Sequence, residues 1–437
     1  MDNQIVKPSI LPGFMELLPS DQILFNKMLD TIRNNYEKYG FVPIDTPVIE
    51  KSEILLAKGG GETEKQIYRF NKGDNDLSLR FDLTVPLARY VAQHFSDLNF
   101  PFRRYQISKV FRGERNQKGR FREFYQCDID IIGNGKLSII NDAEIPTIIY
   151  STFKDLGFDS FTIHINNRKV LNGFYDALNI ENKIEVLRTV DKLDKIGFEV
   201  VKEELIKLQI DEVAIEKILN FIKIDGSNQE ILKALLDLKI NNAMFEEGID
   251  ELSKVIHYID CFEVPSKNYK IDLKVARGLD YYTGTIYETT LDDYPQIGSV
   301  CSGGRYDNLA EYYTKQKLPG VGISIGLTRL FYQLREANII SSEASSLTEL
   351  LIIPLDTNID YSIKLASKLR ASNIITEVYF DDAKMVKKLN YSDKLGIPYV
   401  IFVGSEEINT NILTLKDMKS GEQFKLSIDE ILLKVGE

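Results

Sequence analysis

Residues 111–126 read Phe-Arg-Gly-Glu-Arg-Asn-Gln-Lys-Gly-Arg-Phe-Arg-Glu-Phe-Tyr-Gln, a concentration of positive charge in a chain of formal net charge −11. The cations are Arg112, Arg115, Lys118, Arg120 and Arg122. Polar and apolar residues alternate on both sides, over 105–111 and 124–132, which predicts two antiparallel strands joined by a turn at 116–119. Arginines held on strands suit phosphate recognition, and the interleaved aromatic side chains suit stacking on a base. The segment therefore predicts a hairpin that binds a polyanion, the alternative being a solvated charged face.

The size and composition are those of an ordinary soluble globular protein with two or three domains. The chain has 437 residues, of which 43% are hydrophobic and 27% charged. No apolar run is long enough to span a membrane, and residues 1–4 lack the features of a secretory signal, so we expect no membrane partner. The three cysteines and three histidines lie far apart, which argues against a disulfide framework, a protein-bound metal site and a Ser-His-Asp triad. We expect a cytoplasmic protein in a reducing environment.

The pattern of apolar residues divides the chain into four parts. Strands and helices alternate over 1–167 and 266–340, residues 168–265 have helical spacing throughout, 341–348 are a polar linker, and 349–437 alternate β and α. In the first part we expect helices at 21–39, 83–95 and 143–156, and strands at 41–44, 77–81, 270–275 and 286–290. The last part predicts a small α/β domain with a largely parallel sheet, because its strands are rich in Val and Ile.

Three further motifs are ambiguous when each is taken alone. Residues 277–284 (RGLDYYTG) suit either a ligand site or a strand end with packed tyrosines. Residues 302–307 (SGGRYD) suit either close approach of a ligand to the backbone or a plain tight turn. Arg329, which follows the glycine-rich strand 320–326, suits either a ligand contact or a salt bridge. The sequence has no Walker-type phosphate loop, so a nucleotide would be bound by arginines on strands.

Together the motifs resemble class II aminoacyl-tRNA synthetases, and among them the histidyl-tRNA synthetase family. Helix 21–39 with GFVPIDTP at 40–47 looks like class motif 1, residues 111–126 look like motif 2, and residues 320–330 look like motif 3. The family-specific match lies in ARGLDYY at 276–282, SGGRYD at 302–307 and LRFDLT at 79–84. The resemblance extends from about residue 11 to the C-terminus.

The resemblance implies a mixed α/β (α+β) fold and a two-step reaction. The fold would have an antiparallel-sheet catalytic core with a helical insertion, followed by a C-terminal α/β anticodon-binding domain. Histidine and ATP would form histidyl-adenylate and pyrophosphate, and histidine would then pass to the 3′-OH of tRNA(His). Neither step needs a protein nucleophile, which is why charge-stabilising arginines dominate the motifs.

Matching positions imply roles for individual side chains. Arg112 and Arg277 are the expected catalytic residues, on opposite sides of the α-phosphate. ATP is expected to contact Arg112, Glu114, Arg120, Phe124 and Arg329. Histidine is expected to contact Asp82, Thr84, Arg112, Gln126, Asp130, Arg277, Tyr281 and Tyr282. Within that set, Asp82, Thr84 and Gln126 match the ammonium-binding positions, whereas Asp130 and Tyr282 match those that read the ring.

The resemblance also implies partners. Arg115, Gln117 and Lys118 in the hairpin loop are expected to contact the acceptor end of the tRNA, with Gln117 at the extra 5′ guanosine of tRNA(His). Mg²⁺ is expected to bind with ATP through phosphate oxygens, without a dedicated protein metal site. Motif 1 implies a homodimer.

Two other functions remain open from the sequence. One is an inactive relative that serves as a regulatory subunit in histidine biosynthesis. Such subunits generally lack the anticodon domain and lose motif residues. The other is a general nucleic-acid-binding module, which would bind RNA without any need for ATP.

Overall fold

The computed structural model describes residues 6–57, 62–114, 119–276, 281–342, 345–355 and 359–436. Internal contacts divide the chain into two compact units, one of residues 1–15 and 29–336 and the other of residues 16–28 and 337–437. Helix α1 (Pro19–Lys38) therefore begins in the second unit and ends in the first.

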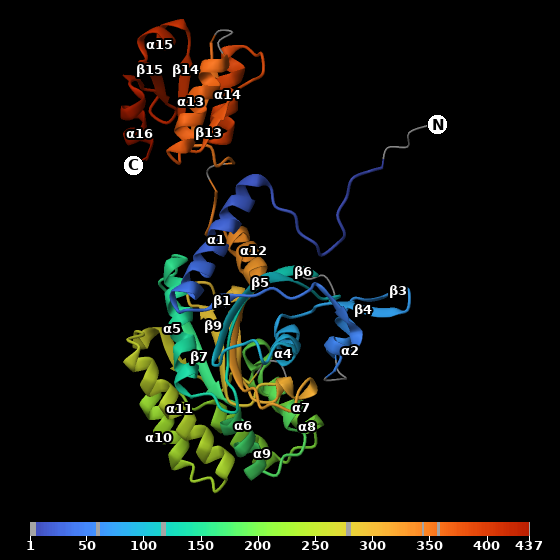
Figure 1. The fold of residues 1–437 in the computed structure, drawn as a ribbon. Helices are drawn as coiled ribbons and strands as arrows, with labels where there is room; N and C mark the ends of the chain where they lie inside the picture. The colour runs from blue at the N-terminus through green and yellow to red at the C-terminus, as the bar shows by residue number, and fades with distance from the viewer. Residues whose placement is uncertain are drawn as a thin grey trace. The chain divides into compact units, whose positions relative to one another are not determined.

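Within the described residues, a mixed sheet of eight strands forms the centre of the first unit, in the order β1-β5-β6-β11-β10-β9-β7-β8 (Figure 1). All neighbouring pairs from β5 to β7 are antiparallel, whereas β1 pairs parallel with β5 and β8 pairs parallel with β7 at the two edges. The predicted antiparallel core is therefore confirmed. Its strands are β1 (Val42–Pro43), β5 (Phe102–Phe111), β6 (Glu123–Ile132), β7 (Phe161–Asn167), β8 (Tyr269–Ile271), β9 (Thr285–Leu291), β10 (Ser299–Tyr306) and β11 (Gly320–Ile325).

The two faces of this sheet differ in polarity, because successive side chains along a strand point to opposite faces. The register places Ile129 and Tyr287 on one face and Asp130 and Gly322 on the other. Helix α5 (Ile140–Asp155) covers the apolar face, and the Tyr287 hydroxyl donates to its backbone over 2.7 Å. The polar face is thereby available for a site.

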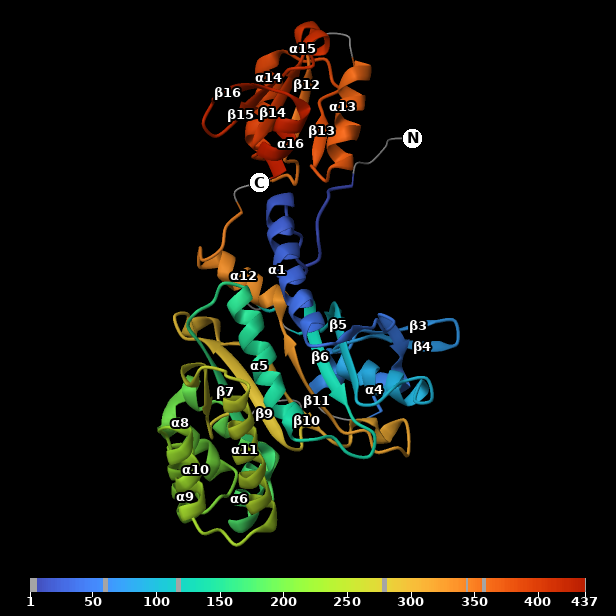
Figure 2. The same ribbon diagram turned by 60° about the vertical axis from the view of Figure 1, so that its left-hand side comes forward.

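The first unit also has smaller elements, of which Figure 2 labels β3, β4, α4 and α12. The smaller elements are β2 (Ile49–Lys51), α2 (Ser52–Leu55), α3 (Glu62–Gln66), β3 (Arg69–Lys72), β4 (Asn75–Leu79), α4 (Thr84–Gln93), η1 (Ser266–Asn268), η2 (Pro295–Ile297), η3 (Leu309–Tyr312) and α12 (Leu327–Glu336). The helices predicted at 21–39, 83–95 and 143–156 are present with shifted ends. The strand predicted at 270–275 is too long, since β8 ends at Ile271.

A run of helices separates β7 from β8, as the helical spacing of 168–265 predicts. These are α6 (Arg168–Ala177), α7 (Lys183–Val190), α8 (Leu193–Lys207), α9 (Glu212–Ile222), α10 (Asn228–Asp237) and α11 (Ala243–Cys261). Polar caps begin several of them; Ser227 and Glu230, for example, form a capping box at the start of α10. Helix α11 packs against both α6 and α5 (Figure 2). Gly173 and Gly248 permit this approach, because a Cβ on either would lie 2.5–2.6 Å from backbone nitrogen of the facing helix.

The second unit is built on a sheet of five strands within its described residues, in the order β13-β12-β14-β15-β16. The prediction of a largely parallel sheet is wrong for two of its strand pairs. Strand β12 pairs parallel with β13 and β14, whereas the pairs β14-β15 and β15-β16 are antiparallel. The terminal hairpin joins the sheet as its last two strands. The elements are β12 (Leu350–Pro354), α13 (Ile359–Ala371), β13 (Thr376–Val378), α14 (Met385–Leu395), β14 (Tyr399–Val403), α15 (Ser405–Thr410), β15 (Leu413–Asp417), β16 (Gln423–Leu426) and α16 (Ile428–Gly436).

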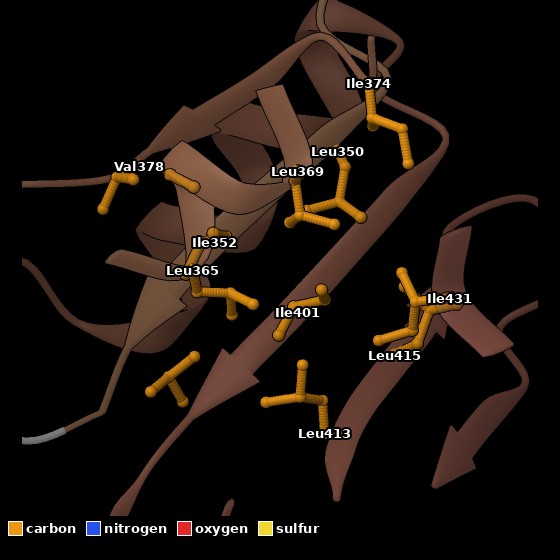
Figure 3. Packing of buried hydrophobic residues seen from close by; sticks show 12 residues of the cluster. Leu350, Ile352, Leu365, Leu369, Ile374, Val378, Ile401, Leu413, Leu415 and Ile431 are labelled. Atoms are coloured by element: carbon orange, nitrogen blue, oxygen red, sulfur yellow. The ribbon is translucent and has the colours of Figure 1, made fainter. Parts of the chain in front are cut away.

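Alternating residues of β12 bury both faces of this sheet. Leu350 and Ile352 meet Leu365 and Leu369 of α13 in one cluster, to which Ile431 of α16 also belongs (Figure 3). Leu351 and Ile353 belong to a second cluster, against which α14 packs. No described helix is both long enough and apolar enough to cross a membrane.

Candidate active site

A cavity of about 470 Å³ on the polar face of the large sheet brings together most of the predicted site residues. Those that line it are Asp82, Thr84, Arg112, Glu114, Arg120, Phe124, Gln126, Asp130, Tyr281, Tyr282 and Arg329. Arg115, Gln117, Lys118 and Arg277 lie outside the described residues. Side chains almost 250 positions apart in the chain therefore converge on one space.

Glycines on two neighbouring strands leave room for this cavity. Gly322 of β11 is in register with Asp130 of β6 and with Gly304 of β10. A Cβ on Gly322 would lie 2.2 Å from Asp130 Oδ1, and a Cβ on Gly304 would lie 2.6 Å from the Thr285 carbonyl oxygen. Because residues 302–306 belong to β10, the plain tight turn considered for this motif is wrong. The glycines instead keep space open beside Asp130.

Arg112 and Phe124 form one end of the cavity. Arg112 Nε donates to the Phe81 carbonyl over 3.0 Å, and the guanidinium carbon lies 5.1 Å from the centroid of the Phe124 ring. These contacts fix the guanidinium and leave its two terminal nitrogens for an anion. Glu114 lies beside Arg120, with 3.4 Å between Oε2 and Nη1. A cation, an aromatic plane and a carboxylate at one end suit a nucleotide.

Arg329 reaches the cavity from the first turn of α12. Its Nη2 donates to the Ile297 carbonyl over 3.0 Å, which ties the guanidinium to the loop before β10. The turn itself is fixed to β6, because the Tyr125 backbone N–H donates to Thr328 Oγ1 over 2.8 Å.

Asp130 is held by two side chains at the other end of the cavity. The Tyr306 hydroxyl donates to Asp130 Oδ1 over 2.7 Å, and Arg104 Nη2 lies 2.5 Å from Asp130 Oδ2. Arg104 is fully buried and faces Asp130 in register across β5 and β6. Burial raises the pKa of Asp130, and the Arg104 guanidinium opposes that rise. The pair suits a carboxylate kept charged to accept from a ligand N–H.

Replacing Arg104 by Met is expected to destabilise the protein by about 3–5 kcal/mol, because a buried carboxylate would lose its cation. The midpoint of urea unfolding at pH 7.5 measures this. Arg103→Met is the matched control: Arg103 pairs with Glu144 over 2.9 Å, but both side chains are about one-fifth exposed. Its loss should be nearer 1 kcal/mol. Equal losses for the two variants would contradict a special role for the Arg104 pair.

Asp82 and Thr84 lie where the chain enters α4. The Val85 backbone N–H donates to Asp82 Oδ1 over 3.1 Å, which caps the helix start. Burial raises the pKa of Asp82 to about 6, against the opposing effects of Arg112 and Arg104. The Thr84 side chain hydrogen-bonds Tyr281.

Two predicted tyrosines form a wall of the cavity. The ring centroids of Tyr281 and Tyr282 are 4.9 Å apart, and that of Tyr281 lies 5.9 Å from Tyr306. Burial raises the pKa of both Tyr281 and Tyr282 above the ordinary value, so both phenols stay protonated and can donate hydrogen bonds.

Gln126 and Asp128 lie between the two ends of the cavity on the same face of β6 as Phe124 and Asp130. Gln126 Nε2 donates to Ser324 Oγ over 2.8 Å, and Ser324 also hydrogen-bonds Asp128. Burial raises the pKa of Asp128 to about 7, and Arg104 opposes that rise.

Sequence reasoning did not single out four of the residues described here, namely Arg104, Asp128, Ser324 and Tyr306. Asp128 had a signal, since Gln126, Asp128 and Asp130 share one face of a strand by simple alternation. Arg104 comes before the strand expected to start at 105, and its role depends on register with Asp130. Arg305, which belongs to the same motif as Tyr306, instead forms a buried ion pair with Asp142, with 2.6 Å between Nη2 and Oδ2.

An antiparallel sheet that carries an Arg-Glu-Phe hairpin and a glycine-rich strand with a following Arg is the catalytic architecture of class II aminoacyl-tRNA synthetases. A family model described as histidyl-tRNA synthetase matches residues 13–330, and one described as anticodon binding domain matches residues 349–437. The chain belongs to the histidyl-tRNA synthetase family.

Individual relatives are similar to this chain over nearly its whole length. The chain is 69% identical to the histidine–tRNA ligase of Clostridium tetani, over 99% of each chain. It is 52% identical to that of Clostridium acetobutylicum, over 98% of this chain and all of the other. The crystal structure of histidyl-tRNA synthetase from Nostoc sp. PCC 7120 superposes with a TM-score of 0.92 at 40% identity, covering 99% of each chain.

Proposed function

We propose that this protein is an active histidine–tRNA ligase, which activates L-histidine with ATP and transfers it to the 3′-OH of tRNA(His). One observation carries the proposal: a single cavity joins a nucleotide-like end at Arg112 and Phe124 to an amino-acid-like end at Asp82 and Asp130. In that arrangement the carboxylate of the amino acid and the α-phosphate of ATP would meet at Arg112.

At the nucleotide end, Phe124 would stack beneath the adenine and Arg329 would cover its other side. Glu114 would accept from the adenine amino group, and Arg120 would reach the outer phosphates. Arg112 would bind the α-phosphate together with the histidine carboxylate, with Arg277 on the opposite side. Both arginines would stabilise the charge that develops on phosphorus, so that no protein nucleophile is required.

At the amino-acid end, Asp130 and Tyr282 would read the imidazole ring, with Tyr281 packed beside it. Asp82, Thr84 and Gln126 would hold the ammonium group. A site that leaves buried polar groups unpaired when a ring lacks N–H donors can reject such an analogue by roughly 10⁴-fold.

Mg²⁺ is proposed to bind with ATP. Among the side chains that the structure describes, no group of three or more His, Cys, Asp and Glu is arranged to hold a metal ion. In the proposal, phosphate oxygens supply most of the ligands of the ion, which neutralises phosphate charge.

The remaining assignments concern the tRNA and the assembly. Arg115, Gln117 and Lys118 would meet the acceptor end of the tRNA. We propose a catalytic domain of residues 1–167 and 266–340, a helical insertion at 168–265, a linker at 341–348 and an anticodon-binding domain at 349–437. We further propose a homodimer located in the cytoplasm.

No observation favours the regulatory-subunit alternative. A solved structure described as an ATP phosphoribosyltransferase regulatory subunit/histidyl-tRNA synthetase, from Bacillus halodurans, superposes with a TM-score of 0.76. At 21% identity that likeness concerns the fold alone.

The test is histidine-dependent exchange of pyrophosphate into ATP, followed by charging of tRNA(His). Both reactions are expected with protein purified free of host synthetase. The general RNA-binding alternative predicts RNA binding with no exchange, and the regulatory-subunit alternative predicts histidine binding without charging.

A further inference from the structure

Three buried oxygens around the cavity have no hydrogen-bond partner among the described residues. They are Oδ2 of Asp82, Oε1 of Gln126 and Oδ1 of Asp128, and all three residues line the cavity. Buried polar atoms without a partner are rare in folded proteins. Three acceptors that line one cavity are available to a ligand that donates several hydrogen bonds.

Ser324 determines which atoms of Gln126 and Asp128 remain free. Its hydroxyl has one proton to donate, and Asp128, as a carboxylate, can only accept it. Ser324 therefore accepts from Gln126, in agreement with the 2.8 Å bond from Gln126 Nε2. The amide oxygen of Gln126 and the second carboxylate oxygen of Asp128 are left without a donor among the described residues.

Asp82 and Thr84 are arranged in a similar way. One oxygen of Asp82 accepts from the Val85 backbone, which leaves Oδ2 free. The Thr84 side chain is hydrogen-bonded to Tyr281. Asp82 Oδ2 is thus the free carboxylate oxygen on this side of the cavity, and the Thr84 hydroxyl oxygen keeps acceptor capacity beside it.

The ring-reading carboxylate is separate from these three acceptors, because Asp130 already accepts a hydrogen bond from Tyr306 and forms an ion pair with Arg104. An ammonium group has three N–H donors and no acceptor, and it carries a positive charge. Three acceptors, two of them carboxylates, match its three N–H donors in number and are opposite to it in the sign of their charge. We propose that Asp128 is a further ligand of the substrate α-ammonium group, which it holds together with Asp82 and Gln126 beside Thr84; this inference rests on the proposed function.

Electrostatics support the assignment. Burial raises the pKa of Asp82 to about 6 and of Asp128 to about 7, and the negative charge of Asp82 adds to the rise at Asp128. Two buried carboxylates that repel each other are stabilised in their charged forms by a cation that contacts both. A substrate ammonium group supplies that cation.

The test compares two ligands on one variant. Asp128→Asn keeps the shape of the side chain and removes its charge. L-histidine and 3-(imidazol-4-yl)propionate share the ring and the carboxylate, but only histidine has the ammonium group. At pH 8, calorimetric titration should show that the variant binds histidine about 10- to 100-fold more weakly, as for the loss of a charge-assisted hydrogen bond. Its affinity for 3-(imidazol-4-yl)propionate should change less than about threefold.

The affinity ratio between variant and wild type should also depend on pH. The pKa of Asp128 is affected by Arg104 of β5, Ser324 of β11, Asp130 of β6 and Asp82. The charge of Asp128 in turn affects the pKa of Tyr36, Arg80, Cys127, Tyr282 and Cys301. A carboxyl with a raised pKa is protonated at lower pH, and the wild type then loses its charge advantage. The affinity of the wild type divided by that of the variant is expected to fall toward one as the pH drops through about 7. Titration of the substrate ring cancels because both proteins bind the same ligand.

Each outcome decides the matter. Unchanged histidine affinity in Asp128→Asn would overturn the proposal, and so would equal weakening of both ligands, which signals a structural role. If the Asn variant has a lowered melting temperature, the same two titrations on Asp128→Ser apply the same criterion. Failure of the wild type to bind histidine would instead remove the proposed function, and this inference with it.

Discussion

Arg112→Ala is expected to lower the rate of histidine-dependent pyrophosphate exchange by about 10²- to 10³-fold, the usual cost of removing a donor that stabilises transition-state charge. The guanidinium is fixed by the Phe81 carbonyl at 3.0 Å and by the Phe124 ring at 5.1 Å. Its terminal nitrogens are therefore placed before substrate arrives, and Ala removes them without changing the sheet. Steady-state exchange with ATP and histidine both saturating measures the effect on kcat.

Lys109→Ala is the matched control for Arg112→Ala. Lys109 is a cation on β5, three residues before Arg112, but it is exposed and pairs with Glu123 over 2.6 Å. Its exchange rate should change less than about threefold. If Arg112→Ala raised only the KM for ATP and left kcat intact, Arg112 would contribute uniform binding and not transition-state stabilisation.

Gly322→Ala is expected to weaken histidine binding more than about 100-fold, because its methyl group has no room. The added Cβ would lie 2.2 Å from Asp130 Oδ1 and 2.3 Å from the Ile129 carbonyl oxygen. Asp130 would have to leave the position in which Tyr306 holds it. Equilibrium titration of histidine without ATP measures the loss, so the nucleotide end of the cavity makes no contribution.

Gly326→Ala serves as the control for Gly322→Ala, since a Cβ at Gly326 meets nothing within 4 Å. Its histidine affinity should stay within about threefold of the wild type. A Gly322→Ala protein that is folded by circular dichroism and binds histidine normally would contradict the position of the ring pocket beside Asp130.

Much of the fold follows from local pattern, and the deviations have local causes. The hairpin of β5 and β6 follows from alternation alone. Strand β8 ends at Ile271 because Asp272 turns the chain, its Oδ1 accepting from the Lys274 N–H over 3.1 Å. Asp272 also hydrogen-bonds His164, with 2.9 Å between Oδ2 and Nδ1. That partner lies 108 positions away in the chain, and local sequence pattern cannot reveal it.

In the second unit, the order of the strands in the sheet could not be predicted from local sequence pattern. The terminal hairpin has the same local pattern whether it stands alone or extends a sheet. Its pairing with β14 is decided by Leu413 and Leu415, which complete the cluster formed by β12 and α13. Such a choice depends on burial across the whole unit.

Sequence motifs name residues that line the cavity, whereas strand register places others that no motif names. Every described member of the predicted set lines the cavity. Arg104 is different, because only pairing between β5 and β6 places it opposite Asp130. The free oxygen of Asp128 depends on a hydrogen bond to Ser324, which lies on another strand nearly 200 residues away.

The most direct test of the central claim is ATP–pyrophosphate exchange with a panel of amino acids. Protein purified free of host synthetase should exchange pyrophosphate with L-histidine, and an Arg112→Ala preparation made in the same way should lose that activity, which excludes contamination. Exchange without any amino acid, or with another amino acid and not with histidine, would contradict the claim.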